Sequence, residues 1–330
     1  MLWSPLLLVS APPQPMLRLD RRIVANAAAY LTATSEALAA KSKCPRCFMH
    51  ASLCVCSEAE KVASQHKLDF DSSPRFECRV VMHYKEFGRP SNTGKFLPML
   101  MPDHSSIAIY GTEECHQSIE FMVENNAVVL FPETDSTELN PQTLPVLFPN
   151  NTKVNVLCVL DSTWNEAKTM NKWIPRSIPR AHLAEGALMS GESLYRIRKQ
   201  ASLGSDKTTL STIEAAGAAL DTIQGTSKFS VAFTEILKYS VDAVFKQRGY
   251  KQVYGHAIQP NMSNASSSHD CFTRATVQRP KACPKCKQTS RFKNLGSASL
   301  DAEMSADGGV CRRWRCKDCG FIFVNSTAYV

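Results

Sequence analysis

The sequence predicts an α/β fold with a mainly parallel sheet and a zinc site near each end of the chain. Short apolar segments alternate with segments of helical spacing, which is typical of a parallel sheet flanked by helices. Two compact cysteine clusters accompany this alternation. The expected strands are 78–83, 105–110, 127–131 and 154–160, and the expected helices are 114–123, 163–173, 210–224 and 228–248.

Local patterns justify the first elements in turn. An Ala-rich stretch before residue 41 has helical character. Val80 and Val81 are β-branched residues within a short apolar run, and two further apolar runs follow them. The segment 137–151 is rich in Pro and Asn, which predicts a loop.

The second half of the domain follows the same logic. The apolar run 154–160 predicts a buried central strand. Pro175 and Pro179 end the helix that follows, because proline cannot continue a helix. Leu210 and Ile213 then begin another run of helical spacing.

Length and charge suggest appendages on a main domain. The chain has 330 residues, 44% of them hydrophobic, and a net charge of +8. Between residues 279 and 319 there are ten Lys/Arg against four Asp/Glu, a surplus of six. Such a basic segment favours phosphate contacts, with a solubilising surface as the alternative. We expect an extension over 1–40, a main domain over 41–258, a linker over 259–281 and a small module over 282–330.

The first forty residues allow more than one interpretation. Residues 1–10 are apolar but too short to span a membrane, and no other segment qualifies. Arg18, Arg21 and Arg22 with few acids suit a mitochondrial presequence, whereas a disordered extension or a gene-model artefact fits equally. We expect a cytoplasmic or nuclear protein, with a mitochondrial location as the alternative.

Four cysteines near the N-terminus predict a structural zinc site. The chain has thirteen cysteines, and eight of them lie in two clusters of paired type, which indicates metal binding in a reducing compartment. A tetrahedral zinc ion takes four thiolates and then has no open position. The ligands of the first site are Cys44, Cys47, Cys54 and Cys56.

The second cluster predicts a zinc ribbon near the C-terminus. Two C-x2-C knuckles are typical of such ribbons, and Cys311 between them is an alternative ligand. Trp314 and neighbouring arginines suit stacking on RNA and neutralising its phosphates. A ribbon that binds protein, or nothing, is the alternative. The expected ligands are Cys283, Cys286, Cys316 and Cys319.

The segment after the central strand carries the strongest functional signal. The apolar run ends abruptly at Asp161, and Trp164 follows three residues later. Ligands bind at the carboxyl ends of strands in α/β folds, so an acid and an aromatic there can supply a base and a stacking surface. The plainer alternative is that Asp161 or Ser162 caps the next helix and that Trp164 lies in the core.

Seven segments in order resemble the DTW-domain family, from about residue 44 to about residue 250. Ser162 stands where the family often has Gly. The matching segments are Cys44-Pro45-Arg46-Cys47 with Cys54-Val55-Cys56, His83-Tyr84-Lys85-Glu86, Ser91-Asn92-Thr93-Gly94, Leu130-Phe131-Pro132-Glu133-Thr134-Asp135, Asp161-Ser162-Thr163-Trp164, Tyr195-Arg196-Ile197-Arg198-Lys199-Gln200 and Leu210-Ser211-Thr212-Ile213-Glu214-Ala215.

The resemblance implies a tRNA-uridine aminocarboxypropyltransferase with a SPOUT-like α/β fold. Such an enzyme moves the 3-amino-3-carboxypropyl group of S-adenosylmethionine to N3 of a uridine and releases methylthioadenosine. Protein orientation must select the γ-carbon of the donor, and N3 needs a base because its proton is tightly held. The uridine must also be unpaired, since N3 lies on its Watson–Crick edge.

The family signature assigns roles to residues that spacing alone does not. Asp161 is the candidate base, with Thr163 and Trp164 beside it as catalytic residues. The expected cofactor contacts are Leu130, Pro132, Thr134, Asp135, Leu160, Ser211, Thr212 and Glu214. The expected substrate contacts are His83, Glu86, Arg89, Asn92, Tyr195, Arg196, Arg198 and Lys199.

Several of these residues also have plain structural explanations. Ser211 and Glu214 form a helix-start signal by themselves, although neighbouring donors can hold a cofactor carboxylate. A lone histidine such as His83 is more often structural. Two rival functions remain, a methyltransferase of related fold and a non-enzymatic, zinc-dependent RNA-binding adaptor. We expect tRNA as the partner, no membrane, and a homodimer as an option that the resemblance leaves open.

Overall fold

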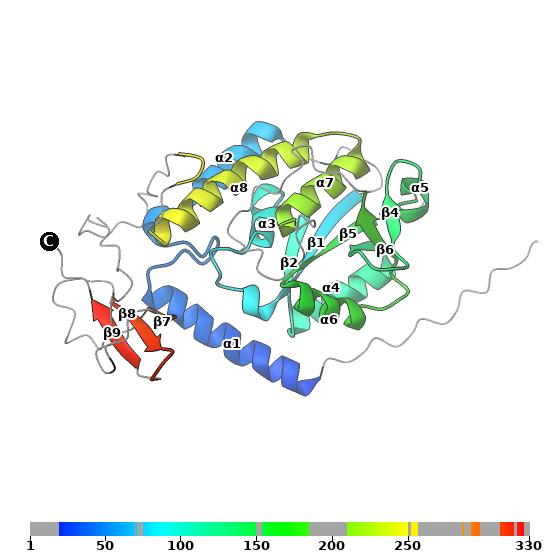
Figure 1. Cartoon of the computed structure of the whole chain (residues 1–330). Coiled ribbons are helices and arrows are strands. Elements are labelled where there is room, and N and C mark those ends of the chain that lie inside the picture. Colours follow the sequence, from blue (N-terminus) through cyan, green and yellow to red (C-terminus); the bar gives the residue numbers. More distant parts are fainter. Residues whose placement is uncertain are drawn as a thin grey trace, which may run out of the picture. The chain divides into compact units, whose positions relative to one another are not determined.

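A computed structural model gives the fold of the chain (Figure 1). It describes residues 20–68, 70, 75–149, 154–184, 210–249, 252–256, 286, 292–297, 311–319 and 322–326. The chain divides into two compact units, Met1–Ala265 and Ser266–Val330. The division lies within the segment expected as a linker.

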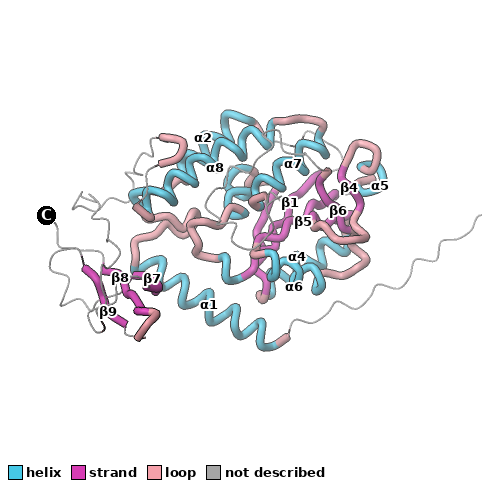
Figure 2. Tube along the Cα trace, in the orientation of Figure 1, coloured by secondary structure: helices cyan, strands magenta, loops and turns pink. Residues whose placement is uncertain are grey.

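A parallel six-stranded sheet forms the centre of the first unit. The strand order is β2-β1-β5-β3-β6-β4, and every pair of neighbours is parallel. This sheet with its flanking helices confirms the predicted α/β class (Figure 2). The strands are β1 Arg75–His83, β2 Ser105–Tyr110, β3 Asn126–Leu130, β4 Thr137–Leu139, β5 Val154–Asp161 and β6 Arg180–Leu183.

Helices cover both faces of the sheet. The α-helices are α1 Arg21–Ala40, α2 Cys56–His66, α3 Leu97–Leu100, α4 Glu113–Glu124, α5 Leu144–Leu147, α6 Trp164–Trp173, α7 Thr212–Gln224 and α8 Lys228–Gln247. The 3-10 helices are η1 Ala51–Leu53, η2 Tyr84–Glu86 and η3 Gly94–Phe96.

The two faces of β5 explain why this strand reads as a continuous apolar run. Leu157 and Val159 belong to the core shared with α2, α3, α7 and α8. Cys158 and Leu160 belong to the core on the opposite face, with α4 and α6. Successive side chains on a strand point to opposite faces, so a strand buried on both is mostly apolar. In β5 the uninterrupted apolar run covers residues 156–160, between the buried polar residues Asn155 and Asp161.

The loop expected over 137–151 is wrong in part. Residues Thr137–Leu139 form β4, and Leu144–Leu147 form a short helix with proline in its first turn. The Thr143 hydroxyl donates to the Glu138 carbonyl oxygen at 2.6 Å and fixes the connection between them. β4 exists because it pairs with β6, which the sequence also did not reveal. Both strands are too short to produce a periodic pattern.

Helix α1 packs onto the turns after β1 and β2. Ala27 is fully buried, and a Cβ on Gly111 would come within 2.6 Å of it. Gly111 has a φ of +103°, so it tolerates both this backbone conformation and the close approach of the helix. The Tyr30 hydroxyl donates to the Lys85 carbonyl oxygen at 3.1 Å. The Ala-rich stretch therefore forms a docked helix of the first unit.

The second unit contains a small antiparallel sheet. Strands β7 Phe292–Ser297, β8 Cys311–Cys316 and β9 Ile322–Ser326 pair in that order. Within the described part of the chain, none of the helices has the length and apolar content that crossing a membrane requires.

Candidate functional site

The candidate site lies where β1, β3 and β5 reach their carboxyl ends. Asp161 is the last residue of β5, and Met82 of β1 pairs with it. On the other side, β3 ends at Leu130, which pairs with Val159. The turns that leave these three strands therefore meet at one edge of the sheet, the usual place for ligands in α/β folds.

Asp161 is buried and held by two side chains from distant segments. It is 2% exposed. Its Oδ1 accepts a hydrogen bond of 2.6 Å from the Thr212 hydroxyl, and its Oδ2 accepts one from the Asn92 amide. Thr163 is the N-cap residue of α6, so the interpretation of Asp161 as the cap of that helix is wrong.

Gly94 allows the Ser91–Gly94 turn to lie directly against Asp161. A Cβ at this position would lie 2.7 Å from both Cγ and Oδ2 of the aspartate. The turn is also tied to helix α7, because the Ile213 amide donates to the Thr93 hydroxyl at 3.4 Å. Three segments therefore converge on one carboxylate.

Lys95, next to this turn, is almost completely buried. It is 2% exposed, and its Nζ donates to the Pro90 carbonyl oxygen at 2.8 Å. The Nζ also lies over the rings of Phe48 and Phe96, at 5.3 Å and 5.1 Å from their centroids. Burial lowers the pKa of Lys95 to about 7, against the opposing effect of the cysteine cluster and Asp161. No sequence pattern signalled this lysine.

Trp164 is exposed at the start of α6, so the core interpretation of this residue is wrong. It is 48% exposed and stacks on Phe131, with ring centroids 5.2 Å apart and an interplanar angle of 18°. Lys168 lies over the same indole at 5.4 Å. An exposed indole supported from below by a buried ring is a suitable platform for a planar ligand.

Thr163 and Glu166 form a capping box that starts α6. The Glu166 Oε2 accepts from the Thr163 hydroxyl at 2.8 Å and from its amide at 3.3 Å. The other oxygen, Oε1, lies 3.5 Å from Lys85 Nζ and 3.7 Å from His83 Nδ1. Sequence reasoning missed Glu166, although T-x-x-E before a helix is a capping-box signal.

His83 has a structural environment. It is 7% exposed and stacks on Tyr84 and Tyr110. Its Nδ1 accepts from the Lys85 amide at 3.3 Å, which starts η2. Burial lowers the pKa of His83, although nearby Glu166 opposes this effect. Of the other expected substrate residues nearby, Glu86 is buried and accepts from exposed Arg89 at 2.7 Å.

The turn after β3 combines exposed residues with one half-buried carboxylate. Pro132, Thr134 and Asp135 are exposed, as a cofactor-facing loop requires. Glu133, which sequence reasoning did not single out, accepts from Asn171 at 2.9 Å and pairs with exposed Arg176. These contacts fix the turn beside the exposed indole.

The start of α7 is a capping box, as the sequence predicts. The Ser211 hydroxyl and amide donate to Glu214 Oε2 at 2.6 Å and 2.8 Å. The Glu214 amide donates back to Ser211 Oγ at 3.4 Å. Thr212 is the first helical residue, and its side chain reaches Asp161. The first residues of α7 therefore both cap the helix and contact the candidate base.

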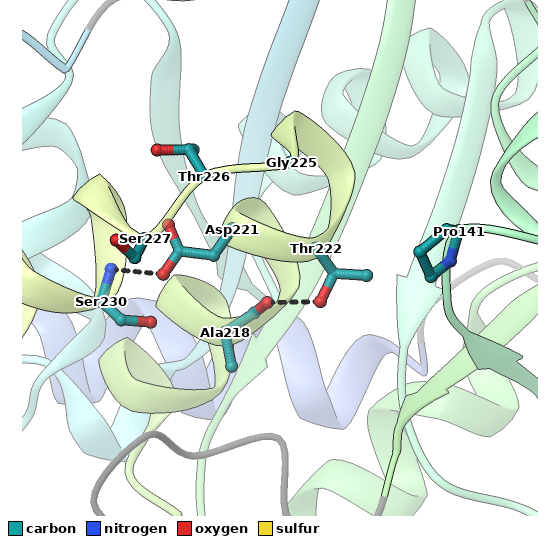
Figure 3. A pocket seen from close by; sticks show the side chains of 8 residues that line it. All are labelled: Pro141, Ala218, Asp221, Thr222, Gly225, Thr226, Ser227 and Ser230. Carbon is teal, nitrogen blue, oxygen red and sulfur yellow. Dashed lines mark hydrogen bonds between the residues drawn. The ribbon is translucent and has the colours of Figure 1, made fainter.

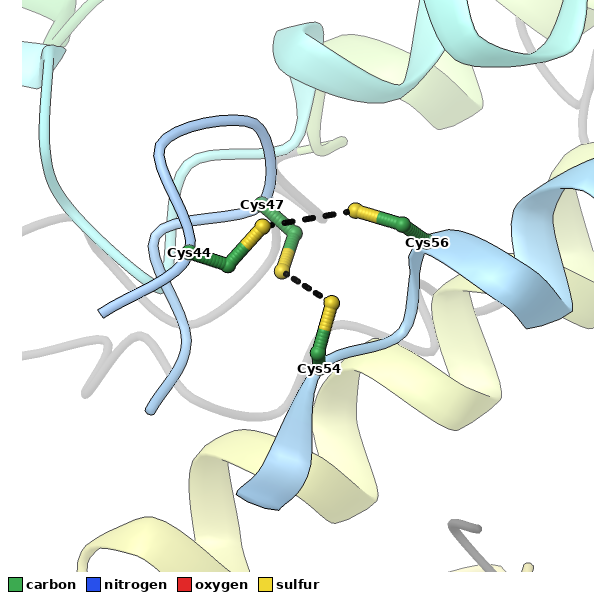
Figure 4. Close-up of side chains that lie close together, drawn as sticks. All are labelled: Cys44, Cys47, Cys54 and Cys56. Carbon is green, nitrogen blue, oxygen red and sulfur yellow. Dashed lines mark hydrogen bonds between the residues drawn. The ribbon is translucent and has the colours of Figure 1, made fainter. Parts of the chain in front are cut away.

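The first cysteine cluster fits a zinc ion. Figure 4 shows the four sulfurs of Cys44, Cys47, Cys54 and Cys56 turned towards one another, and all lie within 4.8 Å. Two of the Sγ–Sγ distances, Cys44–Cys56 and Cys47–Cys54, are 3.6 Å. A tetrahedral site with Zn–S bonds of about 2.3 Å places its sulfurs about 3.8 Å apart.

The second cluster brings three cysteines together in the small unit. Cys286, Cys316 and Cys319 place their sulfurs within 4.8 Å, and the Cys286–Cys316 distance is 3.7 Å. The fourth expected ligand, Cys283, lies outside the described residues. The candidates Tyr195, Arg196, Arg198 and Lys199 also lie outside them.

A surface pocket of about 330 Å³ lies away from the Asp161 site. It surrounds the turn between α7 and α8, and Figure 3 shows Asp221 and Thr222 on one side with Pro141 opposite. Asp221 accepts from the Ser230 amide at 2.9 Å, and the Thr222 hydroxyl donates to the Ala218 carbonyl oxygen at 2.9 Å. These polar groups already serve helix α8 and helix α7, so this pocket offers no evident chemistry.

A protein-family model matches the segment that contains this edge of the sheet. The family model described as "DTW domain" matches residues 41–245. The match includes the first cysteine cluster, the turn that contains Gly94, and Asp161 with its partners. It excludes α1 and the small C-terminal sheet. No solved structure matches the chain.

Proposed function

The chain belongs to the DTW-domain family, and from this premise we propose that it transfers the 3-amino-3-carboxypropyl group of S-adenosylmethionine to N3 of a uridine in tRNA. The family match supports a role in tRNA modification. The observation that carries the proposal is that a buried carboxylate, Asp161, and an exposed indole, Trp164, both lie near the end of the central strand. We also propose that the sheet is SPOUT-like.

In the proposed reaction Asp161 takes the proton from N3 as this nitrogen attacks. The N3–Cγ bond forms while the bond between Cγ and the sulfonium sulfur breaks, and the sulfur keeps the electron pair in methylthioadenosine. The donor supplies its own leaving group, so the protein contributes orientation and the base. Because Asp161 is 2% exposed, Asn92 or Thr212 must yield for the uridine to reach it.

The proposed donor site lies between the β3 turn and the start of α7. Leu130, Pro132, Thr134, Asp135 and Leu160 would line one side of it, next to Trp164. On the other side, Ser211, Thr212 and Glu214 surround amide donors at the start of α7. The bonds from the Ile213 and Glu214 amides are long, at 3.4 Å, so a carboxylate can replace them at little cost.

The uridine side of the site, the two cysteine clusters and the domain limits belong to the same proposal. His83, Glu86, Arg89 and Asn92 would form the uridine side of the site together with the segment 195–199. Zinc in each cysteine cluster would be structural, since four thiolates leave no open position. We propose 41–258 as the catalytic domain, 259–281 as a linker and 282–330 as a zinc ribbon, with 1–40 containing docked α1 after an N-terminal extension.

Asp161→Asn tests the proposed base, because it keeps the shape and removes the basicity. We expect turnover to fall about 10²- to 10⁴-fold, while S-adenosylmethionine still raises the melting temperature of the variant. Glu120→Gln, an exposed position on α4, is the matched control and should behave as the unaltered protein. Near-normal turnover of Asp161→Asn with intact cofactor binding would refute the assignment.

The same measurements separate the two rival functions. A methyltransferase would release S-adenosylhomocysteine in place of methylthioadenosine. An RNA-binding adaptor would bind tRNA but would show no thermal stabilisation by S-adenosylmethionine, since only a ligand that binds the native state stabilises it.

A further inference from the structure

The outer face of α6 carries an aromatic and two lysines at regular spacing. Trp164, Lys168 and Lys172 are all exposed and lie four residues apart, whereas Met170 and Trp173 are buried against the sheet. Residues four apart are neighbours on a helix surface, so the three side chains form one stripe about 12 Å long. The stripe begins at the site edge and leads away from it.

The charges of this stripe are uncompensated along the helix. The one acid of α6, Glu166, is engaged with Thr163, His83 and Lys85. Among the described residues, neither Lys168 nor Lys172 is paired with an acid. A solvated basic face is the ordinary explanation for such lysines, but it does not account for an exposed indole at their end.

Trp164 supplies the second observation, which points to a ligand. The exposed large hydrophobic side chains of the described residues are five valines and this one tryptophan. Phe131, which is buried, holds the indole by stacking, and Lys168 covers it as a cation. An exposed aromatic ring next to positive charge is the arrangement that binds an unpaired base and its phosphates.

We propose that Trp164, Lys168 and Lys172 form an RNA-contacting surface, in which Trp164 stacks on an unpaired base and the two lysines bind the adjoining phosphates. The inference rests on the proposed function for the identity of its ligand. It adds the direction from which the RNA strand reaches Asp161, along the outer face of α6. When the base stacks, the Lys168 ammonium moves from the indole to a phosphate.

Salt dependence of RNA binding tests this surface without any transfer reaction. The assay is fluorescence anisotropy with the full, zinc-loaded chain and labelled unmodified tRNA, in the absence of S-adenosylmethionine. Each lost phosphate contact lowers the slope of log Kd against log salt by about 0.7 for a single-stranded segment. The double variant Lys168→Gln with Lys172→Gln should therefore lose about 1.4 from this slope. Lys246→Gln, at an exposed position of α8, is the control and should keep the full slope.

Substitution of Trp164 should change the affinity for RNA but not its salt dependence. Trp164→Ala should weaken binding about 5- to 150-fold, as expected for one stacked base, and should leave the salt slope unchanged. Trp164→Phe keeps a ring on Phe131 and should retain most of the affinity. Thermal unfolding of each variant verifies that it folds.

An unchanged salt slope in the double lysine variant, or full affinity in Trp164→Ala, contradicts this inference. Neither result depends on the reaction, because no donor is present. If the chain transfers no group but these slopes and affinities change as expected, the proposed function fails and the RNA surface stands.

Discussion

Gly94→Ala tests directly whether the Ser91–Gly94 turn packs closely against Asp161. The new methyl group would lie 2.7 Å from Cγ and Oδ2 of Asp161, and 3.0 Å from its Cβ. Carbon atoms in contact lie about 3.5–4.0 Å apart, so one side must move by about 1 Å. The aspartate cannot move freely, since Asn92 and Thr212 hold its two oxygens.

The expected cost follows from this clash. Overpacking a well-filled site costs about 1–3 kcal/mol. Breaking one hydrogen bond to the charged carboxylate adds about 1.5–3 kcal/mol. The combined loss of about 2.5–6 kcal/mol lowers the melting temperature of a domain of this size by about 5–24 °C. Thermal unfolding of the zinc-loaded protein measures the change.

A double-mutant cycle identifies the cause of the loss. In an Asp161→Ala background the atoms Cγ and Oδ2 are gone, so Gly94→Ala should cost less there by about 0.5–3 kcal/mol. If the two substitutions are additive, Gly94 does not act through Asp161, and the account of this turn is wrong. A variant as stable as the unaltered protein would refute the clash itself.

Three further predictions concern zinc, pH and α1. Chelation, or Cys54→Ser in the first cluster, should release zinc and lower the melting temperature sharply, because binding of structural zinc contributes to the free energy of folding. A protein that keeps its full melting temperature without measurable zinc would contradict the structural role of the metal. Burial lowers the pKa of His83 from its usual 6.5, so as pH falls through 6.5 the unfolded chain is protonated first and the free energy of unfolding decreases. In urea unfolding, the free energy of unfolding of His83→Gln should decrease less between pH 7 and pH 5 than that of the unaltered protein. An equal decrease in both proteins would exclude His83 as the source of the pH dependence. Ala27→Leu should lower the free energy of unfolding by about 1–3 kcal/mol, because the larger side chain would overpack against Gly111. Ala29→Leu, at an exposed position of the same helix, should change it little. Equal effects of the two substitutions would show that α1 does not dock as described.

Much of the fold was predictable because it rests on local patterns. The segment that forms β5 is buried on both faces of the sheet, and apart from Asn155 it is apolar up to Asp161. The capping box of Ser211 and Glu214 follows from residue types three apart, and the structure contains both of its bonds. Helices α4, α6, α7 and α8 were expected within two residues of their observed ends.

The remainder depends on contacts between distant residues. β4 becomes a strand only by pairing with β6, which in turn pairs with β3, and both β4 and β6 are too short for a periodic pattern. The hydrogen bond from Asn92 to Asp161 joins segments 69 residues apart, so no local pattern reveals it. Lys95 looks like an ordinary surface lysine in the sequence, yet the fold encloses it. The family motif marks Asn92 and Gly94 without giving their physical reason, which is the close approach to Asp161.

The most direct test of the central claim is the identity of the small product. Purified chain is incubated with S-adenosylmethionine and unmodified tRNA, and the products are identified by mass spectrometry. We predict methylthioadenosine, together with a uridine that is heavier by one aminocarboxypropyl group. S-adenosylhomocysteine with a methylated uridine would contradict the proposed orientation of the donor, and neither product in the presence of bound tRNA would contradict the proposed enzyme.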